Sequence, residues 1–196
     1  MSPLGDLRFL LRITRSYAIL RRYVVVNGFD GALTMLGLLV GFRLSAPVPL
    51  EVVIAACLGA AVALGASGLS SAFISETAER RLALHELEQA MILDLESSAH
   101  GRAARLVPYL VAAGNGLSPL VLSLFIMLPL WLVDGVMLLV PPLDAAVVLA
   151  FGVVFLLGAY LGHVGKTSWL GSGLHALLIA LATMGAIFLL EKALGG

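Results

Sequence analysis

Residues 23–42 read YVVVNGFDGALTMLGLLVGF, and this stretch decides the class of fold. Its only charged side chain is Asp30, and its length is sufficient for an α-helix to cross about 30 Å of hydrocarbon. Four further apolar stretches have similar lengths: 50–75, 106–133, 143–163 and 170–190. We therefore expect five transmembrane helices.

The composition requires lipid as the solvent for much of the surface. The 196 residues are 60% hydrophobic and only 12% charged, with a mean hydropathy of +1.04. Twelve lysines and arginines balance twelve aspartates and glutamates. The chain therefore has no excess of positive charge that would attract nucleic acid. Cys57 is the only cysteine, which excludes an internal disulfide and a cysteine-clustered metal site.

The segments between the apolar stretches complete the predicted organisation. Residues 1–22 place apolar side chains on one helical face and arginines on the other, which is typical of an interfacial amphipathic helix. Helices 1 and 2 are expected within 23–75 and helices 3 to 5 within 106–196. The polar residues 76–105 are rich in helix formers and predict a short acidic extension of the second helix. The fold class is thus an all-α integral membrane protein with an amphipathic helix and a cytoplasmic extension.

The distribution of basic residues predicts the orientation in the membrane. With the N-terminus in the cytoplasm, ten of the twelve lysines and arginines lie inside, and only Arg43 and Lys192 lie outside. The five spans then put the C-terminus on the opposite side. We expect a multi-pass protein of the cell (inner) membrane.

Asp30 is the most informative residue of the first span. A carboxylate at the centre of a membrane helix costs about 2.5–3.5 kcal/mol unless it faces protein or a water-filled cavity. Asn27 and Thr34 lie three residues before it and four after it, so the three side chains share one face. They predict an ion or proton path. The alternative is a protonated Asp30 that stabilises helix packing through a hydrogen bond to a neighbouring helix.

The second span carries a row of serines. Ser67, Ser71 and Ser75 repeat at intervals of four residues and share one helical face. This face could line the same ion path. Because Gly65 and Gly68 lie among the serines, close helix packing through small residues is the alternative.

The polar segment after the second span concentrates carboxylate and imidazole groups. If it is helical, one face presents His85, Glu88, Glu96 and His100, and an adjoining strip presents Glu79, Glu86 and Asp94. Such groups bind divalent cations of the iron, manganese or zinc type. A solvated charged face, with Arg80 and Arg81 as partners of the carboxylates, is the alternative.

Three segments resemble a known family. They are VVNGFDGALTMLGLLVG at 25–41, FISETAERRL at 73–82 and FLLGAYLGHVGKTSWLGSGLHALLIALATMGA at 155–186. In this order they resemble the vacuolar iron transporter family, in which an Asp-Gly pair of the first helix is followed ten residues later by a glycine. Asp30, Gly31 and Gly41 match that pattern. The chain resembles a short member without the full cytoplasmic metal-binding domain.

The resemblance implies a function. It implies a proton-coupled homodimeric transporter that moves ferrous or manganous ion out of the cytoplasm, with Asp30 in the path and the metal as substrate rather than cofactor. Gly68 and Ala72 stand where the family carries methionine and glutamate in the second helix, and Glu76 or Glu79 could substitute for the missing carboxylate. The partners expected are a divalent metal ion, protons and the lipid bilayer.

Two other classes of function compete with transport. A membrane scaffold or regulator that keeps the fold without transporting is the alternative, favoured by the absent methionine and glutamate. An enzyme is not expected, because the chain contains neither an HExxH nor a GxSxG motif.

Overall fold

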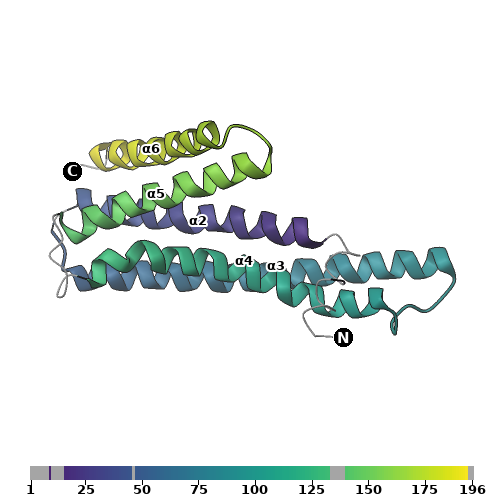
Figure 1. The fold of residues 1–196 in the computed structure, drawn as a ribbon. Helices are drawn as coiled ribbons and strands as arrows, with labels where there is room; N and C mark the ends of the chain where they lie inside the picture. The colour runs from purple at the N-terminus through teal and green to yellow at the C-terminus, as the bar shows by residue number, and fades with distance from the viewer. Residues whose placement is uncertain (1–8, 10–15, 46, 133–139, 194–196) are drawn as a thin grey trace. The chain divides into compact units, whose positions relative to one another are not determined.

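The computed structural model describes residues 9, 16–45, 47–132 and 140–193, which contain five long helices and no strand (Figure 1). The helices are α2 (Ser16–Leu44), α3 (Leu50–Met91), α4 (Ala99–Trp131), α5 (Pro142–Val164) and α6 (Trp169–Ala193). Each is long and apolar enough to cross a membrane. The prediction of an all-α fold with five helices long and apolar enough to cross a membrane is therefore confirmed for the described residues.

The first helix begins earlier than its apolar stretch. Helix α2 starts at Ser16, so residues 16–22 form the first turns of the first spanning helix. The rest of the predicted amphipathic helix, residues 1–8 and 10–15, lies outside the described residues. Phe9, the one described residue between them, is helical and exposed.

Helix α3 extends well beyond its apolar stretch. Its 42 residues span about 63 Å at 1.5 Å per residue, roughly twice the thickness of the hydrocarbon core. The helix ends at Met91, and the chain reverses before α4 begins at Ala99. The expectation of one helical face running from His85 to His100 is therefore wrong, because α3 and α4 form a helical hairpin.

Local hydrogen bonds stabilise this reversal. Ile92 adopts a positive φ of 52°, and the Glu88 carboxylate accepts a hydrogen bond of 3.0 Å from the backbone N–H of Leu95. The Ser98 hydroxyl oxygen then accepts bonds from the N–H groups of His100 and Gly101, at 3.1 and 3.3 Å. A serine at this position satisfies N–H groups that have no partner within the first turn of α4.

The chain divides into two compact units. The first comprises the described parts of Met1–Asn27 together with Gly65–Leu117, and its core contains Ala103, Val107 and Val111. The second comprises Gly28–Leu64 together with the described parts of Ser118–Gly196. Its core is larger and includes these residues of four helices: Met35, Leu36, Leu39, Cys57, Ile126, Met127, Ala150 and Val154.

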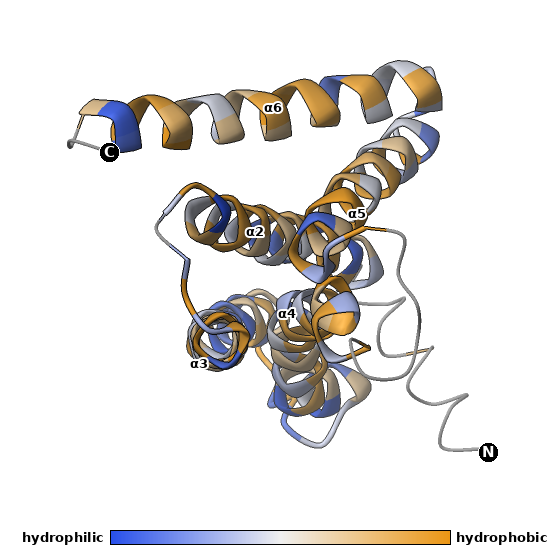
Figure 2. Ribbon diagram, turned by 90° about the vertical axis from the view of Figure 1, so that its left-hand side faces the viewer, coloured by the Kyte–Doolittle hydropathy of each residue, from blue (hydrophilic) through white to orange (hydrophobic). Residues whose placement is uncertain are grey.

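Helices α5 and α6 meet in the second unit through small residues. A Cβ added to Gly158 would lie 2.5 Å from the Cβ of Ala176, and one added to Gly162 would lie 2.6 Å from the Ser172 hydroxyl oxygen. Beyond this contact α6 is mostly exposed and apolar along its length, with a hydrophilic C-terminal end (Figure 2). Lipid or another molecule must cover the remaining apolar surface of α6.

Candidate functional site

Asp30 lies on the exposed face of α2, in the apolar part of the span. It follows Arg22 by eight residues, about 12 Å, and precedes Arg43 by thirteen, about 20 Å. Its carboxylate forms no hydrogen bond or ion pair with any residue that the structure describes. In a membrane, a proton, water or a partner beyond the described residues would have to compensate the charge of this group.

Two glycines set the rotation of α2 that exposes Asp30. A Cβ added to Gly31 would lie 2.8 Å from the Cα of Pro119, and one added to Gly28 would lie 3.1 Å from the Ser118 hydroxyl oxygen. The glycine face of α2 thus packs against the second half of α4. At 100° per residue, Asp30 lies about 130° around the helix from the centre of that face. Close packing against α4 therefore directs the carboxylate away from it.

Substitution of Gly31 is expected to destabilise the protein. In Gly31→Ala the new methyl group meets the backbone of Pro119, which cannot rotate away, so we expect a loss of about 1–3 kcal/mol. Gly41→Ala is the matched control, because a Cβ at Gly41 meets nothing within 4 Å. Thermal unfolding of both variants in one detergent measures the difference. Equal midpoints would contradict the assigned helix packing.

Asn27 belongs to a hydrogen-bonded network inside the first unit. Its side-chain N–H donates to the side-chain oxygen of Asn115 and, at 3.1 Å, to the backbone oxygen of Tyr23. Asn115 is 4% exposed and donates to the backbone oxygen of Gly68 at 2.8 Å. The network joins α2, α3 and α4. These contacts give Asn27 a packing role, and its predicted place in an ion path is untested.

A double-mutant cycle measures this network. Asn27→Ala and Asn115→Ala each remove the amide–amide bond, and we expect a coupling energy of about 0.6–2 kcal/mol, the range for hydrogen bonds between membrane helices. Unfolding of the two single variants, the double variant and the native chain in mixed micelles provides the four values. Strictly additive effects would show that the two amides do not interact.

The serine row lies on the outside of α3. Ser67, Ser71 and Ser75 are exposed, and the Ser71 hydroxyl donates at 2.7 Å to the backbone oxygen of Ser67 within the same helix. The buried face of α3 in this unit carries instead Gly65, Gly68, Ala72 and Glu76. Thr34, predicted to share the path, is half-buried on α2 in the second unit. Asp30 and the serines thus belong to different units, and their common path remains a prediction.

Glu76 is the buried carboxylate among the predicted metal ligands. It is 5% exposed, and its Oε1 atom accepts bonds from Arg80 Nε at 2.7 Å and Arg80 Nη2 at 2.6 Å. Glu79 and Glu86 are exposed on the outer side of α3. The two carboxylates suggested as substitutes, Glu76 and Glu79, are therefore placed differently, one paired in the interior and one in contact with solvent.

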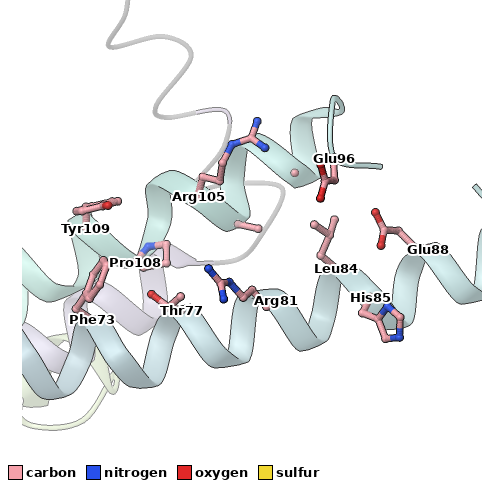
Figure 3. A pocket seen from close by; sticks show the side chains of 12 residues that line it. Phe73, Thr77, Arg81, Leu84, His85, Glu88, Glu96, Arg105, Pro108 and Tyr109 are labelled. Atoms are coloured by element: carbon pink, nitrogen blue, oxygen red, sulfur yellow. The ribbon is translucent and has the colours of Figure 1, made fainter. Parts of the chain in front are cut away.

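Residues of the hairpin of α3 and α4 line an open cavity of about 560 Å³. His85, Glu88 and Glu96 line one end of it, and Arg81 and Arg105 line the middle (Figure 3). Glu96 reaches this cavity through the chain reversal and not through helical spacing with His85. Three of the predicted metal ligands thus share one cavity, whereas Glu79 and Glu86 are not among the residues that line it.

The acidic side chains of the hairpin are not grouped as metal ligands in the described part of the chain. Within the described ranges, no three His, Cys, Asp or Glu side chains lie close enough together to hold a metal ion. Glu88 is engaged by the Leu95 N–H, and the His85 Nε2 lies 3.0 Å from the Gln89 amide nitrogen. Metal binding at His85, Glu88 and Glu96 would need these side chains to rearrange.

Sequence comparison finds a relative of similar length. The uncharacterized protein MJ0645 of Methanocaldococcus jannaschii is 29% identical over 175 residues, which are 88% of each chain. No family model and no solved structure matches this chain. The resemblance to the vacuolar iron transporter family thus remains an expectation from the sequence.

Several residues of the site lie outside the predicted ion path and the predicted metal ligands, although the charged-face alternative already includes Arg80 and Arg81. Arg80 pairs with Glu76, Asn115 pairs with Asn27, and Arg81 and Arg105 line the hairpin cavity. Spacing by four residues could have indicated the Glu76–Arg80 pair. The other partnerships join different helices, and a single sequence carries no signal for them.

Proposed function

We propose that this protein is a proton-coupled divalent-metal transporter that moves ferrous or manganous ion out of the cytoplasm. The observation that carries the proposal is Asp30, an exposed carboxylate without a described partner in the apolar part of a membrane helix. Intramembrane carboxylates of this kind mark ion and proton pathways.

The chemistry of a carboxylate in a low-dielectric environment supports coupling. The ionised group is costly there unless a proton or a metal ion neutralises it. Since one carboxylate cannot hold both cations in the same way, binding of one releases the other. Competition at Asp30 would therefore couple an outward metal flux to an inward proton flux.

A homodimer gives Asp30 the environment that one chain lacks. Two copies related by a two-fold axis can bring the exposed faces of α2 together and shield both carboxylates from lipid. Two facing carboxylates also provide a better site for a divalent ion than one. The two-fold arrangement is part of the proposal, and the exposure of Asp30 supports it.

The polar hairpin would supply metal to this path. Glu79 and Glu86 are exposed, and Glu88 and Glu96 line its cavity, so the surface of the hairpin carries acidic groups that attract cations. Glu76 lies one helical turn after Ala72, where the resembling family carries a glutamate, and faces the same buried side of α3. We propose that Glu76 replaces that ligand when Arg80 releases it.

Transport assays on proteoliposomes test the proposal. Purified full-length protein is reconstituted, and uptake of ferrous and manganous ions is followed with and without an imposed pH gradient. We expect uptake of at least one ion that depends on the gradient and exceeds that of protein-free vesicles. Absence of uptake for both ions under both conditions would overturn the transport proposal.

The alternative is a scaffold or regulator that keeps the fold without transporting. The Asn27–Asn115 network favours it, because one of the predicted path residues is already engaged in helix packing. A scaffold would fold and dimerise while showing no flux in the same assay.

A further inference from the structure

The hairpin cavity begins at the edge of the apolar parts of α3 and α4. The rings of Phe73 and Tyr109 contact each other there, with centroids 4.9 Å apart, and both line the cavity. Arg81 follows Phe73 by eight residues, about 12 Å, and Arg105 precedes Tyr109 by four, about 6 Å. The headgroup layer of a bilayer is about 5–8 Å thick on each side. The backbone of Arg105 therefore lies at the level of the lipid phosphates, and that of Arg81 lies about 4–7 Å beyond this layer, with its side chain extending back toward Thr77 (Figure 3).

The two arginines of the cavity, Arg81 and Arg105, have no acidic partner among the residues that the structure describes. The hydroxyl oxygen of Thr77, which also lines the cavity, is buried and has no hydrogen-bond partner among the described residues. Figure 3 shows Arg81 extending from α3 back toward Thr77. Two guanidinium groups and a free hydroxyl are donors suited to a phosphate.

The acidic end of the cavity lies farther from the apolar segments. Glu88 and Glu96 line this end, beyond Leu84, and extend from opposite sides of the hairpin (Figure 3). From the apolar edge outward, the lining therefore changes from aromatic rings to guanidinium groups and then to carboxylates. A phospholipid with an amine in its headgroup presents the complementary order of acyl chains, phosphate and ammonium.

From this order we propose that the hairpin cavity binds the headgroup of an amine-bearing phospholipid such as phosphatidylethanolamine. Arg81, Arg105 and Thr77 donate to the phosphate, and Glu88 and Glu96 accept from the ammonium. The cavity volume of about 560 Å³ lies within the roughly 300–1,000 Å³ of ordinary ligand pockets. The proposal does not depend on transport, because no residue of the predicted ion path lines the cavity.

Competition between lipids tests the proposal. Full-length protein is placed in nanodiscs that contain equal amounts of phosphatidylethanolamine and phosphatidylglycerol, without added metal, and retained lipids are counted by native mass spectrometry. Arginines acting alone would favour the anionic phosphatidylglycerol. We expect instead at least about threefold more retained phosphatidylethanolamine. Equal retention, or a preference for phosphatidylglycerol, would overturn the proposal.

Paired substitutions separate the two halves of the site. Arg81→Gln with Arg105→Gln is expected to reduce retention of both lipids about tenfold, because two charge-assisted contacts are lost. Glu88→Gln with Glu96→Gln is expected to keep retention but reverse the preference toward phosphatidylglycerol. Arg102→Gln is the control, since Arg102 is exposed on α4 and is not among the cavity-lining residues. Native retention in the double arginine variant, with unchanged thermal unfolding, would overturn the proposal.

The cavity could instead bind a soluble phosphate compound, which has the same phosphate group but no acyl chains. Phosphoethanolamine and inorganic phosphate are titrated against protein in detergent without lipid. We expect neither to bind at concentrations below the millimolar range, because both lack the acyl chains that the bilayer holds beside Phe73 and Tyr109. Tight binding of either, without retention of lipid, would overturn the lipid proposal.

Discussion

Asp30→Asn is expected to reduce gradient-dependent metal uptake at least tenfold in proteoliposomes. The amide keeps the size of the side chain but can neither release a proton nor neutralise a divalent ion. The same variant is expected to retain or exceed the stability of the native chain, because Asp30 is exposed and has no described partner to lose. Loss of flux without loss of stability separates an ion-path role from a packing role.

The control for this variant is another exposed carboxylate of a spanning helix. Glu51→Gln changes an exposed residue in the first turn of α3, at the very start of the apolar stretch 50–75, and is expected to keep native flux. Native flux in Asp30→Asn would remove Asp30 from the path. A large drop in stability in Asp30→Asn would instead support the packing interpretation, in which the carboxyl group is hydrogen-bonded to a second copy.

Arg80→Ala is expected to be the most destabilising single substitution considered, at about 3–5 kcal/mol. The Arg80 and Glu76 side chains are only 14% and 7% exposed, so removal of the guanidinium leaves a buried carboxylate without its ionic partner. Replacement of both residues, as Glu76→Leu with Arg80→Met, is expected to recover most of the loss. Unfolding in a denaturing detergent titration provides these values.

An exposed ion pair of the same chain is the matched control. Arg43 and Asp144 are 2.7 Å apart with side chains 59% and 30% exposed, and Arg43→Ala is expected to cost less than about 1 kcal/mol. Comparable losses in Arg80→Ala and Arg43→Ala would show that burial does not make the Glu76–Arg80 pair important. Failure of the double variant to recover stability would assign Glu76 or Arg80 a further essential contact.

The hairpin shows which cavity-lining residues helical spacing predicts and which it does not. His85 and Glu88 share a face of α3, as their spacing predicts, and they line one cavity. Glu96 joins them because the chain reverses after Met91, which the composition of 76–105 does not reveal. The reversal depends on a positive φ at Ile92, a conformation that β-branched residues rarely adopt.

The sequence by itself determined the all-α class of the protein and the number of helices that are long and apolar enough to cross a membrane. Five apolar stretches suffice for that, since hydropathy and length alone decide whether a segment can cross a membrane. The sequence also identified Asp30 as an anomaly, because a carboxylate among apolar residues is visible without any fold. These properties are local, and each belongs to one helix.

Only the tertiary structure decided which polar residues serve packing and which remain available. Asn27 is hydrogen-bonded to Asn115, and Glu76 is buried in an ion pair with Arg80. Asp30 faces outward because the opposite side of α2 packs closely against α4 at Gly28 and Gly31. The physical reason is helix rotation. Close packing through glycines selects one face of each helix for the interior, and the sequence of that helix alone cannot show which neighbour it meets.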